Sequence, residues 1–234
     1  IKQIVNSIFN RQCSVVNKHK NCIELSFCSK VFSKFLVDNF KKHALNKTIP
    51  EWVKFIHKEY KTQLVLGYLD SDGCVWTSNE SYYVDFVSIS LNLLEGIQDI
   101  LFSLNITSSL KKLRSAKKSI ICDRNVLTRD TYQLSLCPHS TVAFKSLFTC
   151  FLDCKLNKIT SPKKLRKKPQ SSCFISKCGN FIYFKIKKIA KSKYTGFVYN
   201  FECDTHTYLC HHITTHNCDP FEEDSSSDKI NSLG

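Results

Sequence analysis

Residues 60–152 constrain the fold more than any other part of the chain, because they alternate between helical and strand periodicity. The run YKTQLVLGYLDSDG (60–73) is apolar at helical spacing and stops at Asp72-Gly73, a typical helix end. Two strand-like runs, VWTS and YVDFVSIS, precede LNLLEGIQDILFSL (91–104), whose apolar residues share one helix face. The runs ITSSLKKLRS, SIICD and TYQLSLC alternate again, and a last helix is expected over 139–152. The order helix, two strands, helix, two strands, helix predicts an α+β unit.

A weak internal repeat accompanies this pattern. CIELSFCSKVFSKFLVDNF (22–40) resembles TYQLSLCPHSTVAFKSLFTCF (131–151), since each has an alternating run ending in Cys, then a polar turn and a helix-like run. The repeat indicates two copies of one module, the first of which enters the chain near its end.

The composition changes after this unit. Residues 155–170, KLNKITSPKKLRKKPQ, combine two prolines with a dense basic run and are the best linker candidate. A solvated loop and a phosphate-binding segment are equally good interpretations of that run. The short runs NFIYFKIKKIA, GFVYNFEC and HTYLCHHITT are typical of a small all-β unit, and the sequence from Asp219 onward is acidic and rich in Ser.

The charge favours a polyanionic partner. The formal net charge is +14 over 234 residues, and the tail after Cys218 carries five carboxylates against one lysine. The tail's net −4 leaves +18 on residues 1–218, and such an excess is typical of nucleic-acid binding. A lysine-rich codon bias is the alternative explanation.

Other bulk properties exclude further classes. No apolar run approaches the roughly 20 residues that span a bilayer, and no signal peptide is evident, so we expect no membrane partner. We expect a soluble intracellular protein, in cytoplasm or nucleus. The absence of methionine predicts that the chain is a piece of something longer or a processed product. The 13 cysteines fit neither a disulfide framework nor paired zinc hooks, and we interpret most as small buried side chains in a reducing compartment.

Val65–Gly73, VLGYLDSDG, resembles the LAGLIDADG motif of homing endonucleases. NKTIPEWV (46–53) is similar to the K-x-I-P segment that precedes the second motif in endonucleases embedded in inteins, and the helix at 91–104 is similar to the one that follows it. The resemblance implies an αββαββα repeat with pseudo-twofold symmetry, in which the motif helix packs against its twin. It implies that Gly67 lies where the two helices approach closely.

The same resemblance assigns chemistry to Asp72. The family places a carboxylate at this helix end, where it would hold a divalent cation, here expected to be Mg²⁺, for cleavage of double-stranded DNA. Asp70 is the second candidate, on another helix face. No strand-end lysine of the kind that the endonucleases often use is evident, since Cys137 and Pro138 occupy that position. A degenerate, inactive endonuclease therefore stays an alternative.

The DNA contacts are expected on the second half of the repeat, on a strand and the loop after it. The candidates are Lys111, Lys112, Arg114, Lys117 and Lys118. A solvated sheet edge is the alternative interpretation of these charges.

The end of the chain carries a second resemblance. GFVYNFECDTHTYLCHHITTHNC is similar to the last two splicing blocks of an intein. His206 matches the internal histidine, His216 the penultimate histidine and Asn217 the terminal asparagine, so that Cys218 would be the first residue of the host protein.

These residue types suit backbone cleavage. The Asn217 side chain can attack its own carbonyl and form a succinimide, a reaction that proximity accelerates. His216 can supply the proton that the leaving amine needs, and His206 can polarise the same carbonyl. In the family, Cys218 takes the upstream chain by thioester exchange before asparagine cyclises.

The resemblances predict the C-terminal part of an intein carrying a LAGLIDADG (DOD-type) homing endonuclease, followed by an all-β, Hint-type splicing segment. The expected segments are the end of a first repeat (1–45), a second repeat (46–154), a basic linker (155–172), the splicing segment (173–217) and a host flank (218–234). The partners would be double-stranded DNA, the N-terminal half of the intein and the host flanks. Besides the inactive endonuclease, a basic DNA-binding module without catalysis remains an alternative.

Overall fold

The computed structural model describes residues 2–19, 22–78, 81–121, 123–137, 140, 144–145, 155, 175–178, 181–184, 186, 188–197, 199, 203–210 and 213–216. The chain divides into two compact units, Ile1–Phe174 and Ile175–Gly234. The helix expected over 139–152, apart from residues 140 and 144–145, lies outside the described residues, as do most of the predicted linker and the residues after His216.

The first unit begins with a helix, a hairpin and a second helix. These are α1 (Lys2–Phe9), β1 (Ser14–His19), β2 (Cys22–Ser26) and α2 (Lys30–Phe40), with β1 and β2 antiparallel. Ser29 caps α2, since its Oγ accepts a hydrogen bond from the amide of Phe32 at 3.2 Å. The strand, turn and helix predicted for residues 22–40 are confirmed.

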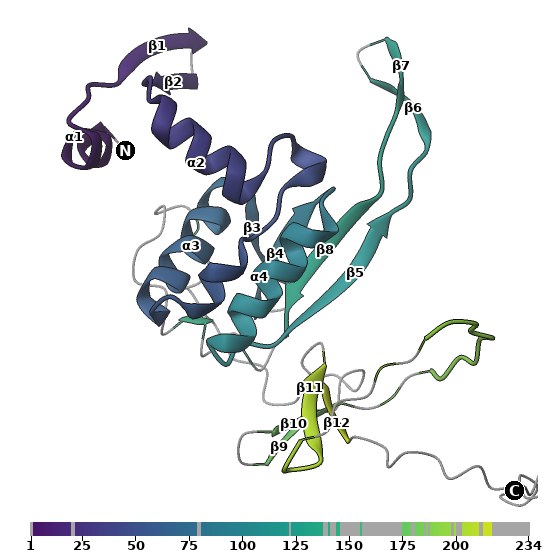
Figure 1. Ribbon diagram of the computed structural model, residues 1–234. Coiled ribbons are helices and arrows are strands. Elements are labelled where there is room, and N and C mark those ends of the chain that lie inside the picture. Colours follow the sequence, from purple (N-terminus) through teal and green to yellow (C-terminus); the bar gives the residue numbers. More distant parts are fainter. Residues whose placement is uncertain are drawn as a thin grey trace, which may run out of the picture. The chain divides into compact units, whose positions relative to one another are not determined.

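A four-stranded antiparallel sheet forms the centre of this unit (Figure 1). Its strands are β3 (Gly73–Ser78), β4 (Ser81–Ser88), β5 (Ser108–Arg114) and β8 (Thr131–Leu136), in the order β3-β4-β8-β5. The helices are α3 (Lys58–Ser71) and α4 (Leu91–Ser103), preceded by two short 3-10 turns, η1 (Ala44–Asn46) and η2 (Glu51–Phe55). The mixed α+β fold is confirmed, with α3, α4, β3, β4, β5 and β8 over the predicted segments.

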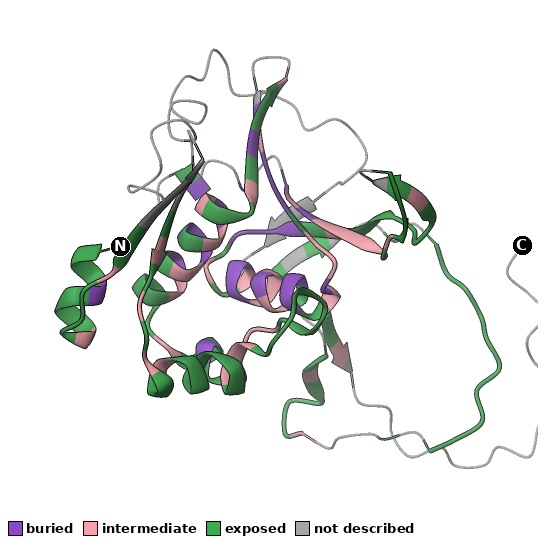
Figure 2. Cartoon of the chain, turned by 90° about the horizontal axis from the view of Figure 1, so that it is seen from above, coloured by how far each residue is buried: buried purple, intermediate pink, exposed green. Residues whose placement is uncertain are grey.

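The core lies between these helices and one face of the sheet (Figure 2). The helices contribute Leu66, Leu69, Leu94, Ile97 and Leu101 among others, all almost fully buried. The sheet contributes every second residue, as strand alternation requires: Val75, Val84, Phe86, Leu134 and Leu136. The intervening residues of β3, β4 and β8 therefore face away from α3 and α4.

The segment before α3 is fixed on α4. The Oγ of Ser90, the N-cap of α4, accepts from the amide of Leu93 at 3.3 Å and donates to the carbonyl of Lys47 at 2.6 Å. A Cβ on Gly96 would lie 2.6 Å from the Cβ of Ile49, so only glycine lets that side chain approach α4 so closely. The K-x-I-P segment thus packs on the helix that the sequence pairs with it.

A second hairpin, β6 (Lys118–Ile121) with β7 (Arg124–Leu127), is inserted between β5 and β8. It continues the ends of β5 and β8 into a projecting arm (Figure 1). The sequence predicted β6 but not β7, because the residues RNVL are two polar ones followed by two apolar ones and do not alternate. The turn uses Asp123 at φ 60°, a conformation that Asp adopts more readily than most residues.

The second unit contains two hairpins in its described part. They are β9 (Ile175–Cys178) with β10 (Phe181–Phe184) and β11 (Thr207–Cys210) with β12 (Ile213–His216). Within the described residues of the whole chain, no helix is long and apolar enough to cross a membrane.

Candidate functional site

Asp72 is the C-cap of α3 and lies at its junction with β3. Its amide donates to the carbonyl of Tyr68 at 3.0 Å, while its side chain is exposed. No hydrogen bond or ion pair engages its carboxylate among the residues that the structure describes. The helix end therefore presents a carboxylate whose oxygens are available to a ligand.

Gly73 makes this junction sharp. A Cβ at Gly73 would lie 2.7 Å from the Cα and 2.8 Å from the carbonyl oxygen of Leu69. Neither backbone atom can move away without distorting the last turn of α3, so only glycine fits here. Gly67 is different, because a Cβ there would meet nothing within 4 Å. The close helix approach expected at Gly67 is therefore not made by any described residue of this chain.

Lys155, which is distant in the sequence, binds the backbone of the same helix end. Its Nζ donates to the carbonyls of Leu69, Asp70 and Gly73. The sequence placed Lys155 at the start of a basic linker, and no local pattern distinguishes it from the other lysines there. A contact across 82 to 86 residues leaves no periodic signal.

A pocket of about 320 Å³ lies beside Asp72. Its lining includes Lys41, Lys47, Gly67 and Tyr68 besides Asp72. The Tyr68 ring stacks on Phe86 at 5.6 Å. Burial raises the pKa of Tyr68 above 10.0, and the negative charge of Asp72 raises it further. One acidic and two basic residues thus line the same pocket.

The residues around Asp72 offer few oxygen donors for Mg²⁺. Within the described part of the chain, no three His, Cys, Asp or Glu side chains gather into a metal site. Mg²⁺, however, is usually held by one or two carboxylates together with substrate phosphates and water, rather than by an all-protein cage. The exposed carboxylate of Asp72 fits one such position.

The predicted DNA contacts lie along the base of the arm. Lys111, Lys112 and Arg114 are on β5, Lys117 is in the following loop and Lys118 begins β6, all of them exposed. The sequence missed Arg124 on β7 and Arg129 before β8, which are also exposed. Alternating exposed cations continue across the arm, which could have indicated both.

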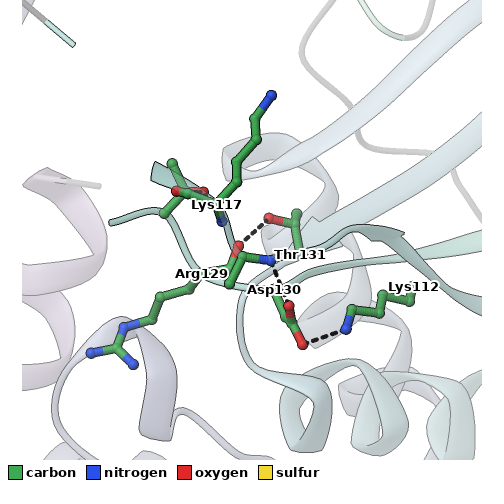
Figure 3. A network of polar contacts seen from close by, with 7 residues as sticks. Lys112, Lys117, Arg129, Asp130 and Thr131 are labelled. Atoms are coloured by element: carbon green, nitrogen blue, oxygen red, sulfur yellow. Dashed lines mark hydrogen bonds and ion pairs between the residues drawn. The ribbon is translucent and has the colours of Figure 1, made fainter. Parts of the chain in front are cut away.

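One of these lysines differs from the rest, because Lys112 forms an ion pair with Asp130 at 2.6 Å (Figure 3). The same carboxylate accepts the amide of Ala116 at 2.7 Å. The hydrogen bond with Asp130 raises the pKa of Lys112, and the hydrogen bonds from Lys112 and Ala116 lower the pKa of Asp130. Lys112 thus helps to close the base of the arm.

Lys117 and Arg129 point away from this ion pair (Figure 3). The backbone of Lys117 is held by Thr128, whose Oγ1 accepts from the Lys117 amide at 3.0 Å and donates to the Lys117 carbonyl at 2.8 Å. No partner of either charged head is recorded among the described residues. The backbone is fixed while the charges remain available to an anion.

The sheet face opposite the helices carries an aromatic pair. Trp76 and Tyr83 are cross-strand neighbours, and their rings stack at 4.2 Å with 12° between planes. The indole N–H donates to Asp85 at 2.6 Å, and Asp85 is itself buried. Since that N–H is already engaged, the exposed 41% of Trp76 offers an apolar surface.

Two of the predicted splicing residues, His206 and His216, lie at one end of the β11–β12 hairpin. Thr207 pairs with His216, so the backbone of His206 lies next to that pair. His206 adopts φ 53°, and its amide donates to the carbonyl of Cys203 at 2.9 Å. Asn217 and Cys218 lie outside the described residues.

The segment that contains Asp72, the sheet and the arm is similar to a known protein family. Residues 59–134 match the model of a LAGLIDADG-like domain. This part of the chain is a LAGLIDADG-like domain. The match runs from α3 to β8, so it includes Asp72, the sheet and the whole arm. The matched family is the one whose motif the sequence resembles at Val65–Gly73.

Several curated proteins are similar to nearly the whole chain. A DNA polymerase of Thermococcus hydrothermalis is 24% identical over 85% of this chain and 11% of its own length. An iron-sulfur cluster assembly SufBD family protein of Mycobacterium bovis is 22% identical over 93% of this chain and 23% of its own length. An uncharacterized protein of Methanocaldococcus jannaschii is 27% identical over 93% of this chain and 25% of its own length. The chain therefore spans a quarter or less of these relatives.

Proposed function

We propose that the chain is the C-terminal part of an intein, in which a LAGLIDADG endonuclease is joined to a self-splicing segment. The observation that carries the endonuclease is the available carboxylate of Asp72 at the end of α3, inside the matched domain. The pattern of relatives supports the insertion. Most of this chain aligns with a small part of proteins as different as a DNA polymerase and an iron-sulfur assembly protein, as expected for an element that interrupts unrelated hosts.

The endonuclease separates binding from chemistry. Phosphates are neutralised along the arm by Lys111, Arg114, Lys117 and Lys118, with Arg124 and Arg129 added to the sequence-based set. Asp72 holds Mg²⁺, which when bound supplies charge stabilisation at the scissile phosphate. Lys41 and Lys47 border the same pocket and favour a phosphate there.

The splicing segment acts on its own backbone. The Cys218 thiolate attacks the thioester that carries the upstream chain, so that a new thioester forms on Cys218 and the former thiol departs. The side-chain nitrogen of Asn217 then attacks its own carbonyl carbon. The bond to Cys218 breaks, and His216 gives a proton to the departing amine. The register of β11 and β12 pairs His216 with Thr207, the residue after His206, and this supports His206 as the group that polarises the carbonyl.

Two substitutions in the full precursor test the proposal. Asp72→Asn should abolish Mg²⁺-dependent DNA cleavage but preserve DNA binding, because it removes one negative charge and no basic side chain. Asn217→Ala should keep the bond to Cys218 intact, whereas Cys218→Ala should release the downstream peptide without joining it to the upstream chain.

Cleavage assays and intact mass spectrometry separate the outcomes. Equal loss of DNA binding and cleavage in Asp72→Asn would contradict the metal role. DNA binding without cleavage in the wild-type precursor would indicate a degenerate endonuclease. Release of a peptide beginning at Cys218 from Asn217→Ala would exclude asparagine cyclisation.

A further inference from the structure

The outer half of the arm exposes aliphatic side chains. Its strands β6 and β7 form a two-stranded sheet of their own, beyond the four-stranded sheet (Figure 1). Ile120 and Leu127 are each 71% exposed, whereas Val84 and Leu134 of the main sheet are almost fully buried. Single aliphatic residues scattered over a surface are normal, whereas apolar side chains gathered on one face indicate an interaction site.

The register places Ile120 and Leu127 on the same face of the hairpin. Lys118 pairs with Leu127, and Ile120 pairs with Asn125. Because successive residues of a strand face opposite sides, these four side chains share one face, and all four are exposed. This face, called the tip face below, presents two aliphatic side chains together with one ammonium group and one carboxamide.

Hydrogen bonds at the inner end of the hairpin fix this register. The carbonyl of Lys117 accepts from the amide of Thr128 at 2.9 Å and from its Oγ1 at 2.8 Å. The same Oγ1 accepts from the amide of Lys117 at 3.0 Å. A slip of one residue would turn Ile120 to the other face, so these contacts decide what the tip face presents.

The charge of the arm favours a polyanion as the partner of this face. Residues 117–129 carry four basic side chains and one acidic one. Duplex DNA offers both phosphates and apolar groups, because the C5-methyl group of thymine projects into the major groove. That groove is about 12 Å wide and admits a two-stranded ribbon, whereas the minor groove is about 6 Å wide.

We infer that the tip face reads A·T pairs in the major groove: Ile120 and Leu127 contact thymine methyl groups, and the Asn125 amide binds the edge of an adenine. The inference rests on the proposed DNA binding of the arm and adds a sequence preference to it. Phosphate contacts from the basic side chains position the ribbon but carry no sequence information. The aliphatic pair supplies that information.

The test asks whether the precursor distinguishes thymine from uracil, which lacks only the C5-methyl group. Duplexes are selected from a randomised library by binding to the full precursor, and each thymine is then replaced singly by deoxyuridine. Ile120→Ser and Leu127→Ser are compared with Val126→Ser, which removes an aliphatic side chain from the opposite face of β7. Anisotropy titrations without Mg²⁺ measure the affinity.

Deoxyuridine at one or more positions should weaken binding of the wild-type precursor by about fourfold, as expected for the loss of one buried methyl group. Ile120→Ser and Leu127→Ser should each abolish this difference at a position, and Val126→Ser should keep it. A difference that survives in both Ile120→Ser and Leu127→Ser would overturn the inference. Asn125→Ala should lose the preference for adenine when the selection is repeated, and an unchanged preference would overturn the adenine contact.

The wild-type measurement separates the two levels of the argument, because deoxyuridine changes the DNA and leaves the protein intact. If the precursor binds no duplex from the library, the proposed DNA binding fails together with the inference. If it binds but no thymine replacement changes the affinity, only the role of the tip face fails. Sedimentation of Ile120→Ser adds an independent check: dissociation of a dimer with an unchanged thymine preference would assign the tip face to a second copy of the chain and overturn the inference.

Discussion

The two glycines of the motif VLGYLDSDG, Gly67 in α3 and Gly73 at the start of β3, should respond in opposite directions to the same substitution. At Gly73 a Cβ would lie 2.5 Å from Leu69 Cδ1, 2.7 Å from Leu69 Cα and 2.8 Å from its carbonyl oxygen. The last two atoms belong to the backbone of α3 and cannot rotate away. Overpacking of this kind costs about 1–3 kcal/mol, so Gly73→Ala should destabilise the chain by that amount.

Gly67→Ala should instead stabilise the chain, because its Cβ would enter open space on an exposed helix position. Alanine in place of glycine inside a helix contributes about 0.5–1 kcal/mol, largely by restricting the unfolded chain. At about 2–4 °C per kcal/mol for a chain of this size, the Tm should rise by about 1–4 °C for Gly67→Ala. It should fall by about 2–12 °C for Gly73→Ala.

Urea unfolding of this chain, followed by the fluorescence of Trp52 and Trp76, measures both free energies of unfolding. A destabilising Gly67→Ala would refute the reasoning, since it would require a neighbour against that helix face. In the full precursor the sign at Gly67 should reverse, because the twin helix expected from the family resemblance would then pack there. A Gly67→Ala that stabilises the chain but impairs the precursor would locate that second helix without a structure of it.

Three other predictions concern the arm and the sheet. Lys117→Ala should reduce the slope of log K for duplex DNA against log salt concentration by about 0.9, whereas Lys112→Ala should change this slope less, since Asp130 engages Lys112. Anisotropy titrations at several salt concentrations measure the slope. Equal changes in the two variants would contradict the prediction. Trp76→Ala should weaken DNA binding by roughly tenfold, about 1.4 kcal/mol, at every salt concentration, because it removes apolar contact and no charge; a changed slope would refute this reason. The pKa of Asp130 in the folded chain lies below its ordinary value of 3.8. The contribution of its ion pair to the stability of the arm is therefore present above pH 3.8 and is lost as the pH falls through the lower pKa of the folded state. Exchange of the Ala116 amide should accelerate over that acidic range and be fast at every pH in Asp130→Asn.

The central elements were predictable because their burial is periodic. In α4 the buried residues Leu94, Ile97 and Leu101 recur at helical spacing, and in β4 Val84 and Phe86 alternate with residues on the other face. The position of Asp72 at a helix end also followed from the sequence, since Asp-Gly after an apolar helix is a strong stop signal. The motif therefore specified where the candidate carboxylate lies.

Features without local periodicity were missed. The exposed strand β7 has no apolar face, so its pairing with β6 becomes visible only in the structure. The ion pair between Lys112 and Asp130 joins β5 to the residue just before β8, and in the sequence both are simply charged residues of a polar stretch. The close contacts at Gly73 and Gly96 were not predicted, because a glycine in a sequence does not reveal which neighbour it admits, and the approach of a twin helix at Gly67 stays a prediction.

The proposed site separates into parts that can be altered independently, and this bears on whether the endonuclease is active. The backbone around Asp72 is held at one helix end by Gly73 and Lys155. The exposed basic side chains depend instead on the arm, whose base is closed by the ion pair between Lys112 and Asp130. Neither part supplies the side chains that fill the core between α3, α4 and the sheet. Loss of the exposed Asp72 carboxylate would therefore leave the fold and DNA binding intact, and a degenerate endonuclease would keep its shape. The state of this one helix end, rather than the fold, therefore decides between an active and a degenerate endonuclease.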